Sequence, residues 1–518
     1  MKKYVKNLLI STISLSSVFA LTGCDLSNPF ASANTDDSTL ATSVEATSIE
    51  AGVSENGFTK TKLNAINTDL KRDYSVANGE QNVLIIPIHL SSGPYSGTWS
   101  DSLIDELSDI IFDTEDSRSY VSYYKTASFD NLIMGGEVSE LYNSTYSVSQ
   151  LEDATYGMTR MYSMFEAAAE WVDANDDTVD IEKDYDKNSD GYIDNIHFMI
   201  DGSDGDDWNS NIWPHMSQTG YYPAATGEFP EVNTYSLSNL DHLEDATTTI
   251  HEQGHIFGLQ DYYNYSYLPS VNHSSNTYYD LVGNADMQDD SMFDWNAYSK
   301  MNMGWIEPYY FDGSKDSATI TISPSGTSGD AIVLGENWNG NAFDEYITLE
   351  LFTEDGNNAY DWDRNYPSSS NYTTTLGEGG VRVSHVDSRL MGMNANDNTN
   401  AYQVDNINDS DYDYYGLKYT NSYDADDYQG YTFDDNNYNL LQVIEADKEN
   451  EFGSVQSDYS KTFLGESDLF QTGDSFSMSE YSNFFYNKTT LNNGDEFPYE
   501  VQFDKVTSDY ATITITKI

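Results

Sequence analysis

The stretch TTTIHEQGHIFGLQDYY, residues 247 to 263, carries two histidines four positions apart with a glutamate between them. On an α-helix, residues i and i+4 lie one turn apart on the same face, so His251 and His255 can present ring nitrogens to one ion. Glu252 projects about 100° round the helix axis, where it can hold a water on that ion without being a ligand. We therefore predict a zinc-binding helix with Glu252 as the general base.

The residues after this helix suggest a third ligand. Gly258 permits the sharp turn that ends a helix, and the returning chain can then bring Asp261 to the ion. Such a site keeps a fourth position for water, as catalytic zinc sites do. Two alternatives stay open: Asp261 as a partner of a ligand rather than a ligand, and Tyr262 or Tyr263 as an extra oxygen donor.

The pattern H-E-x-G-H-x-x-G-L-x-D-Y-Y resembles the immune inhibitor A family of secreted bacterial metalloproteases, which are metzincin-like zinc peptidases. Four further stretches occur in the order that the family leads us to expect: VSYYKTASFDNLIMGGEV (121–138), DKNSDGYIDNIHFMIDG (186–202), IWPH (212–215) and NADMQDDSMFDWNAYSKMNMGWIEP (284–308). The resemblance implies an α+β metzincin-like catalytic domain that hydrolyses peptide bonds of proteins or peptides.

In metzincins a methionine in a tight turn lies below the metal. The resemblance implies Met287 in this role, and Met292 is the competing candidate. The chain departs from the family at Gln260, where a proline is frequent, and in its charge and an Asp/Tyr-rich insertion. These last two departures leave the substrate preference open.

The stretch DYDKNSDGYIDN, residues 184 to 195, predicts a second metal site, for calcium. Oxygen-bearing side chains alternate along it: Asp186, Asn188 and Asp190. Gly191 follows where a calcium loop turns sharply. The closing position holds His197 instead of a glutamate, so Asp194 or Asp184 has to compensate. The alternative is an Asp/Asn/Gly turn with solvated carboxylates.

The N-terminus MKKYVKNLLISTISLSSVFALTGC has a basic start, a short apolar run and small residues before Cys24. The string LTGC at 21–24 resembles a bacterial lipobox, which implies a lipoprotein signal peptide over 1–23 and acylation of Cys24. A plain secretory signal is the alternative. We expect an exported protein held by lipid on the outer side of a cell membrane, at the cell surface.

Composition and periodicity divide the rest of the chain. Residues 24–78 are rich in Ser, Thr and Asp and predict a tether that can include a short prosegment. We assign 79–310 to the catalytic domain and 311–518 to a β-rich, β-sandwich-like region, because its apolar residues alternate between turns. An acidic Tyr/Asn-rich insertion at about 396–438 is interpreted as a solvated loop.

Some elements can be placed more closely. Apolar spacing predicts a helix over 157–175 and strands over 82–90 and 195–200, with Pro87 at a bulge or a sheet edge. Asp241 is the expected N-cap of the histidine helix. In the β-rich region, strands are expected at 317–322, 345–352, 379–386, 440–446 and 510–518.

The formal net charge is −63, from 86 acidic and 23 basic residues. Such a surface repels phosphates, which argues against nucleic acid and anionic lipid surfaces as partners. We expect a monomer. The competing function is a noncatalytic surface lipoprotein, an adhesin or binding protein with structural metal sites. Glu252 favours the peptidase, since a structural site has no use for a base beside an open ligand position.

Overall fold

The computed structural model describes residues 54–63, 75–203, 210–219, 229–263, 280–289, 291–362, 376–394, 397–403, 414–418, 421, 439–453 and 462–518. Cys24 and the signal segment lie outside the described residues. The described chain is a mixture of helices and sheets, compatible with an α+β fold. Within it, none of the helices combines the length and the apolar character that crossing a membrane requires.

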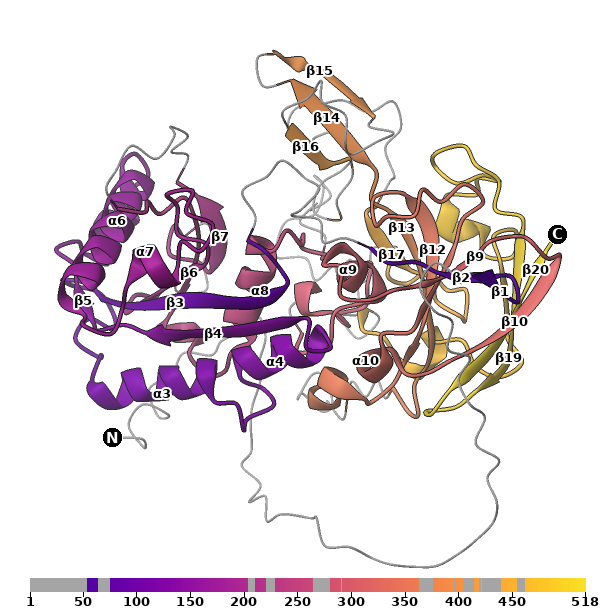
Figure 1. Ribbon diagram of the computed structural model, residues 1–518, viewed down its shortest axis with the longest axis horizontal. Helices are drawn as coiled ribbons and strands as arrows, with labels where there is room; N and C mark the ends of the chain where they lie inside the picture. The colour runs from indigo at the N-terminus through magenta and orange to yellow at the C-terminus, as the bar shows by residue number, and fades with distance from the viewer. Residues whose placement is uncertain are drawn as a thin grey trace, which may run out of the picture.

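The first sheet lies in the N-terminal half (Figure 1). Its strands, in spatial order, are β4 (Leu132–Val138), β3 (Gly79–His89), β6 (Ile196–Ile200), β8 (Thr234–Asn239) and β7 (His215–Gln218). All neighbours are parallel except β7, which runs antiparallel to β8. The short β5 (Tyr142–Asn143) extends the pairing of β3.

Helices cover both faces of this sheet. One face packs against α3 (Asp101–Phe112), α4 (Tyr120–Ala127) and α8 (Thr247–Ile256), and the other packs against α6 (Gly157–Asn175). Short helices complete this half: α5 (Val148–Leu151), α7 (Ile181–Asp184), η1 (Leu240–His242), η2 (Met287–Asp289) and α9 (Ala297–Asn302). Because both faces are covered, β3 carries a continuous apolar run instead of an alternating one.

The predicted helix over 157–175 is confirmed as α6, and the predicted strand over 195–200 as β6. The ring of Phe165 on α6 stacks on Phe198 of β6 at a centroid distance of 4.0 Å. Local periodicity sufficed here because each element buries one regular set of side chains.

Of the two expectations for Pro87, the sheet edge is wrong, because β3 runs between β4 and β6. The pairing register does shift by one residue beside Pro87, as a bulge would require. Ile85 is the last residue of β3 that pairs with β4, and Ile88 is the first that pairs with β5. Pro87 faces the gap between these two strands. A residue without an N–H therefore costs no ladder hydrogen bond there.

Two larger sheets form the body of the C-terminal half. The seven-stranded sheet has the order β1 (Ser54–Glu55), β2 (Phe58–Lys60), β9 (Tyr309–Phe311), β11 (Ala331–Leu334), β12 (Glu345–Phe352), β13 (Gly380–Asp387) and β17 (Leu441–Val443). The four-stranded sheet has the order β10 (Ser317–Ile322), β20 (Ala511–Lys517), β19 (Tyr499–Val506) and β18 (Ser475–Ser477). Short helices in this half are α10 (Ser325–Ser328), η3 (Gly356–Tyr360), η6 (Glu466–Asp468) and η7 (Ser482–Phe485).

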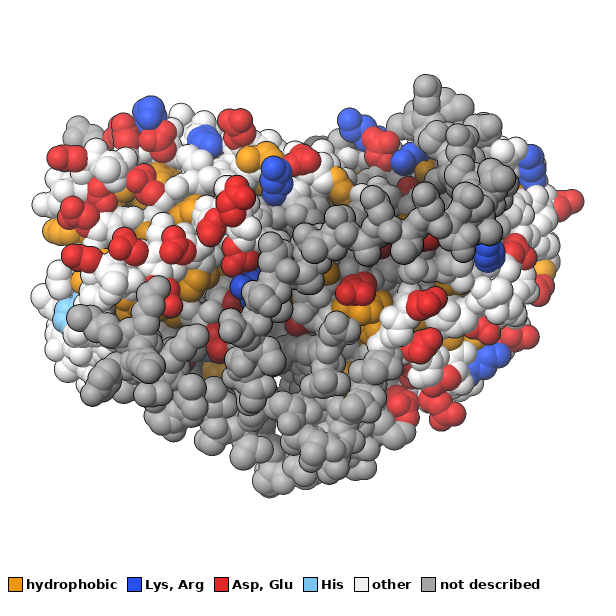
Figure 2. Space-filling view, turned by 90° about the horizontal axis from the view of Figure 1, so that it is seen from below, with side chains coloured by type: hydrophobic (Ala, Val, Ile, Leu, Met, Phe, Trp, Pro, Cys, Tyr) orange, Lys and Arg blue, Asp and Glu red, His pale blue; other side chains and the backbone are white. Residues whose placement is uncertain are grey.

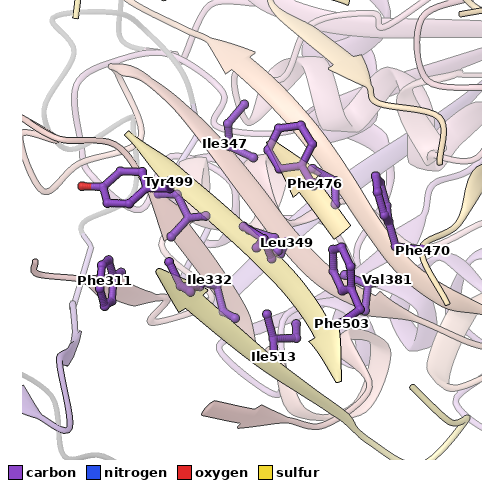
Figure 3. Close-up of a cluster of buried hydrophobic side chains, with 14 of the residues drawn as sticks. Phe311, Ile332, Ile347, Leu349, Val381, Phe470, Phe476, Tyr499, Phe503 and Ile513 are labelled. Atoms are coloured by element: carbon purple, nitrogen blue, oxygen red, sulfur yellow. The ribbon is translucent and has the colours of Figure 1, made fainter. Parts of the chain in front are cut away.

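These two sheets pack face to face. Figure 3 shows their shared core, with Ile332 and Leu349 from the larger sheet next to Phe503 and Ile513 from the smaller. The predicted strands of the β-rich region are confirmed: β10, β12, β13 and β20 match closely, and the 440–446 segment contains the shorter β17.

The predicted tether over 24–78 is wrong at its C-terminal end. Residues 54–60 form β1 and β2, and β2 pairs with β9. Phe58 is buried in the core between the two C-terminal sheets, and Ala77 is buried against the first half. Composition missed this because the apolar partners of Phe58 lie some 250 residues away in sequence.

The Tyr/Asn-rich insertion is also not only loop. Residues 397–403 form β15 and 414–417 form β16, and both pair with β14 (Leu390–Asn394). This three-stranded sheet projects from the body of the molecule in Figure 1. Most of 396–438 besides these strands lies outside the described residues.

The boundary expected at residue 310 does not separate two cores. One cluster joins Tyr262, Phe293 and Tyr298 from the first half to Val333 and Phe352 from the second. The two halves therefore stabilise each other through a common apolar interior. Acidic side chains are spread over the described part of the face in Figure 2, as the net charge of −63 leads one to expect.

Candidate metal centre

Helix α8 brings the two histidines of the opening motif together. His251 is 6% exposed, and its ring centroid lies 4.8 Å from that of His255 with the planes at 89°. The predicted N-cap at Asp241 is wrong, because α8 begins at Thr247. Asp241 instead belongs to η1, where its carboxylate accepts a hydrogen bond from the Tyr95 hydroxyl.

A tight turn then returns the chain to the histidines. Gly258 has φ of +104°, a conformation that glycine adopts without a steric penalty. After it, Oδ1 of Asp261 lies 3.0 Å from Nε2 of His251 and 3.1 Å from Nε2 of His255. The structure thus places all three predicted zinc ligands in one group, and their ligand atoms lie within 4.8 Å of one another.

The other ring nitrogens fix the tautomers of both imidazoles. Nδ1 of His251 lies 2.9 Å from the Met287 carbonyl oxygen, and Nδ1 of His255 lies 2.9 Å from the Leu259 carbonyl oxygen. A carbonyl oxygen only accepts, so each Nδ1 carries the proton and donates it. In the neutral rings, both Nε2 lone pairs then face the Asp261 carboxylate. Three acceptors converge, which is the arrangement that a cation satisfies.

Charges within the group shift each other's pKa. Burial raises the pKa of Asp261, but the imidazoles of His255 and His251 lower it by more than burial raises it. The pKa of Asp261 therefore lies well below its usual range. Burial lowers the pKa of His255, but Asp261 raises it more, and Glu252 adds to that rise. Two carboxylates therefore create a negative potential at the histidine nitrogens.

Glu252 lies on the same turn of α8 and is 6% exposed. Its negative charge adds to the rise in the pKa of His255, after the larger contribution of Asp261. A buried carboxylate beside two histidines and an aspartate can hold and move a proton at this site.

The two tyrosines after Asp261 differ in their surroundings. The hydroxyl of Tyr262 lies in the core, 2.7 Å from the Ser299 hydroxyl. Its oxygen is therefore directed to Ser299 and not to the predicted zinc ligands. Tyr263 stacks against His251 at a centroid distance of 6.3 Å. Only Tyr263 therefore stays a candidate for an extra oxygen donor.

The turn around Met287 supports α8 from below. The Met287 carbonyl oxygen accepts the hydrogen bond from His251, and the Gln288 carbonyl oxygen accepts one from the Tyr262 amide at 2.9 Å. Met292, the competing methionine, contacts Thr247 instead, with its sulfur 2.8 Å from the hydroxyl oxygen one turn before His251. The contact to a predicted ligand thus belongs to Met287, through its backbone.

Other buried polar contacts hold α8 to strand β8 and to helix α4. Nε2 of Gln253 donates to the Ser236 hydroxyl at 2.8 Å, and that hydroxyl also lies 2.8 Å from Nδ1 of His197. The Tyr124 hydroxyl donates to the Ile250 carbonyl oxygen at 2.9 Å. The sequence did not predict these contacts, because only the fold brings the residues together.

The predicted calcium loop folds around its own carboxylates. The Asp186 carboxylate accepts from the amides of Asp190 and Gly191, each at 3.1 Å, and Asp194 accepts from the Lys187 amide at 2.8 Å. Asn188 accepts from the Asp190 amide at 2.9 Å. These four predicted ligands thus share one loop.

The two other residues considered for this site, Asp184 and His197, have different partners. Asp184 pairs with Lys183 at 2.9 Å. His197 is fully buried between Ser236 and Ser238, and burial lowers its pKa to about 3. No three carboxylates of the loop, all of whose residues the structure describes, bring their ligand atoms within 4.8 Å of one another. The loop is therefore more open than the histidine group.

A second group of carboxylates, which the sequence analysis did not single out, lies in the C-terminal half. Ligand atoms of Glu445, Asp447 and Asp468 lie within 4.8 Å of one another. Burial and then the neighbouring carboxylates raise the pKa of Glu445 to about 8, and burial raises that of Asp468 to about 7. The spacing of these residues along the chain carries no recognisable ligand pattern.

No protein-family model matches this chain. A search of curated proteins also finds no match. The geometry of the site is thus the basis for assigning a function.

Proposed function

We propose that this protein is a zinc-dependent endopeptidase. One observation carries the proposal: Oδ1 of Asp261 lies 3.0 Å from Nε2 of His251 and 3.1 Å from Nε2 of His255. Glu252 lies on the same helical turn as the two histidines. A set of two imidazole nitrogens and one carboxylate oxygen suits zinc, and three protein ligands leave a position for a reacting molecule.

The donor set fits the ion on its own chemistry. The side chains of all three residues are at most 14% exposed, and each histidine already uses its other nitrogen on a backbone carbonyl. Histidines that bind zinc are oriented in this way, which also raises their basicity. Zinc bound here lowers the pKa of water and polarises a carbonyl group.

The residues of the chain divide the proton transfers between them. Glu252 accepts a proton from the attacking water and passes it to the amine nitrogen of the leaving group. The products are a carboxylate and an amine, so water is consumed and no other reactant is needed. His251, His255 and Asp261 keep their protonation states throughout, because they act as ligands.

We further propose that the first half is a metzincin-like domain. The turn at Met287 beneath α8 and the antiparallel edge strand β7 on a mainly parallel sheet support this assignment. With the lipobox-like string before Cys24, the proposal extends to a monomeric, lipid-anchored enzyme at the cell surface that cleaves extracellular proteins. It includes no nucleic acid partner.

Calcium remains a proposed second cofactor, in the loop 184–195. Burial raises the pKa of Asp194 to about 6, and the charges of Asp190 and Asp186 add to the rise. A divalent cation would relieve this repulsion. The test is a calcium titration of the purified protein in which the thermal midpoint of unfolding is measured. The Asp186→Asn variant is titrated in the same way for comparison.

The peptidase proposal is tested with the purified protein, its zinc content and the cleavage of casein and a peptide library. We expect cleavage that a chelator stops and added zinc restores. Glu252→Gln should bind the same amount of zinc and lose activity by about 10² to 10⁴-fold, the usual contribution of a general base.

The noncatalytic alternative makes the opposite prediction. If wild type and Glu252→Gln both carry zinc and neither cleaves any member of the library, the metal is structural and the peptidase proposal fails. If the wild-type protein binds no zinc, neither a catalytic nor a structural zinc site at His251, His255 and Asp261 can be maintained.

A further inference from the structure

An arginine in the C-terminal half is tied to the turn beneath the metal group. Arg382 on β13 and Glu350 on β12 face each other in the strand register, and both are 2% exposed. Nη2 of Arg382 lies 2.8 Å from Oε1 of Glu350, and its Nε donates to the same oxygen at 3.0 Å. This pair lies in the interior of the molecule, where a charge without a partner is costly.

The same arginine reaches out of its own sheet. Its Nη1 donates to the Ala285 carbonyl oxygen at 2.7 Å, across 97 positions of the sequence. The guanidinium also lies over the Phe352 ring at 4.4 Å, which restricts it further. Because a guanidinium is planar and rigid, the contact to Glu350 fixes where the donor for Ala285 points.

Ala285 opens the turn that contacts the predicted zinc ligands. Two residues on, the Met287 carbonyl oxygen accepts from His251 at 2.9 Å. One residue further, the Gln288 carbonyl oxygen accepts from the amide of Tyr262, the neighbour of Asp261, at 2.9 Å. A shift of this turn would therefore move two of the three ligands.

A second buried contact fastens the far end of the same segment. The Asp286 carboxylate accepts from the Gln288 amide at 2.9 Å and from the Asn296 amide at 2.6 Å. Glu350 accepts from the Ala297 amide at 3.2 Å. The ion pair thus holds the segment at Ala285 and again at Ala297, on either side of the turn.

We propose that Arg382, held by Glu350, is a positioning residue of the metal centre: it fixes the 285–288 turn and, through it, His251 and Asp261. This inference rests on the proposed zinc site and extends it to the β-rich half. The β-rich half then has a direct part in shaping the site, besides any role in stability.

The test compares two matched pairs of substitutions in the full chain. Arg382→Met with Glu350→Gln removes the donor to Ala285 without leaving a buried charge alone, and it keeps an acceptor for Ala297. Arg389→Met with Asp387→Asn is the control, since Arg389 makes a buried pair at 2.7 Å with Asp387, the last residue of β13. Glu345, which also contacts Arg389, keeps His385 as a partner at 2.9 Å in this variant. Both pairs are expected to fold, because neutral replacements of buried ion pairs are usually tolerated.

Zinc affinity is measured by competition with a chromophoric chelator, and the cobalt-substituted protein gives a spectrum that reports ligand geometry. We expect the Arg382 pair to weaken zinc binding by about 10 to 100-fold and to change the cobalt spectrum, as loss of a ligand-orienting contact does. The Arg389 pair should leave both unchanged. Equal zinc affinity and spectra in the two variants, at a similar loss of thermal midpoint, would overturn the inference.

A metal-free readout separates this inference from the proposed function. Hydrogen exchange of the peptide covering 247–256 should rise in the Arg382 pair and not in the Arg389 pair. If wild type binds no zinc, the proposed function fails while this comparison still decides the positioning role. Unchanged exchange in the Arg382 pair would contradict it.

Discussion

The side-chain oxygen of Gln288 lies 2.4 Å from the place that a Cβ on Gly254 would occupy. The glycine just before the second histidine of HEQGH therefore lets the turn after Met287 pack directly against helix α8. Gln288 cannot easily withdraw, because it is fully buried and its Oε1 accepts a hydrogen bond from Trp295 at 3.2 Å. Close packing at this point brings the turn within reach of His251.

Gly254→Ala is therefore expected to destabilise the protein by about 1 to 3 kcal/mol, the usual cost of an overpacked core. It should also weaken zinc binding, since the displaced turn carries the Met287 carbonyl. Denaturant unfolding measures the first effect. In a Gln288→Ala background the alanine should cost less, and an equal cost in both backgrounds would show that the two residues do not interact.

Asp261 is expected to be a ligand and not merely a partner of the histidines. Asp261→Asn keeps the shape of the side chain but removes its charge, so zinc affinity should fall by more than about 100-fold, beyond the effect of an outer contact. Tyr263→Phe is the control, because it keeps the ring that stacks on His251 and loses only the phenol oxygen. Chelator competition decides between them: an equal loss in the two variants would make the phenol a ligand too.

The cluster of predicted zinc ligands could be predicted because its residues are close in the sequence. His251, His255 and Asp261 span eleven residues, and helix geometry with one glycine turn brings them together. Helix α6 was predictable for the same reason, since its buried face follows from local spacing alone. In both segments, the spacing of residues along the chain is enough to predict which side chains share a face.

The contacts that hold the group in place could not be predicted in this way. His251 meets Met287 across 36 positions, and Arg382 meets Ala285 across 97. The position of Pro87 inside the sheet could not be predicted for a related reason, because a proline is tolerated there only through the gap between β4 and β5. Each of these depends on which elements become neighbours, and that is a property of the whole fold.

The cluster of Glu445, Asp447 and Asp468 in the C-terminal half predicts a pH dependence of stability. Burial and then the charges of Asp468 and Asp447 raise the pKa of Glu445 to about 8, above its ordinary value of 4.5. The folded state thus binds this proton more tightly than the unfolded state does. The stabilisation that the protonated Glu445 provides is complete below about pH 4.5 and is lost as the pH rises to about 8. The free energy of unfolding falls over this range by up to about 1.4 kcal/mol per pH unit.

Urea unfolding of the metal-free protein between pH 5.5 and 8 measures this loss. Glu445→Gln cannot ionise, so its free energy of unfolding should fall less over this interval than that of wild type. Glu449→Gln serves as the control, because Glu449 lies in the same loop with an exposed side chain. Identical pH slopes for wild type and Glu445→Gln would rule out the explanation.

The role of Met287 gives the last prediction. His251 bonds to the carbonyl oxygen of this residue, which any amino acid supplies, while the thioether side chain is fully buried in the core under α8. Met287→Leu nearly conserves the volume, so it should cost less than about 1.5 kcal/mol and leave zinc affinity unchanged. Met287→Ala leaves a cavity, which should cost about 2 to 5 kcal/mol and loosen the turn enough to weaken zinc binding. If leucine weakens zinc binding as much as alanine does, the sulfur itself matters, and support through the backbone is not the whole function of Met287.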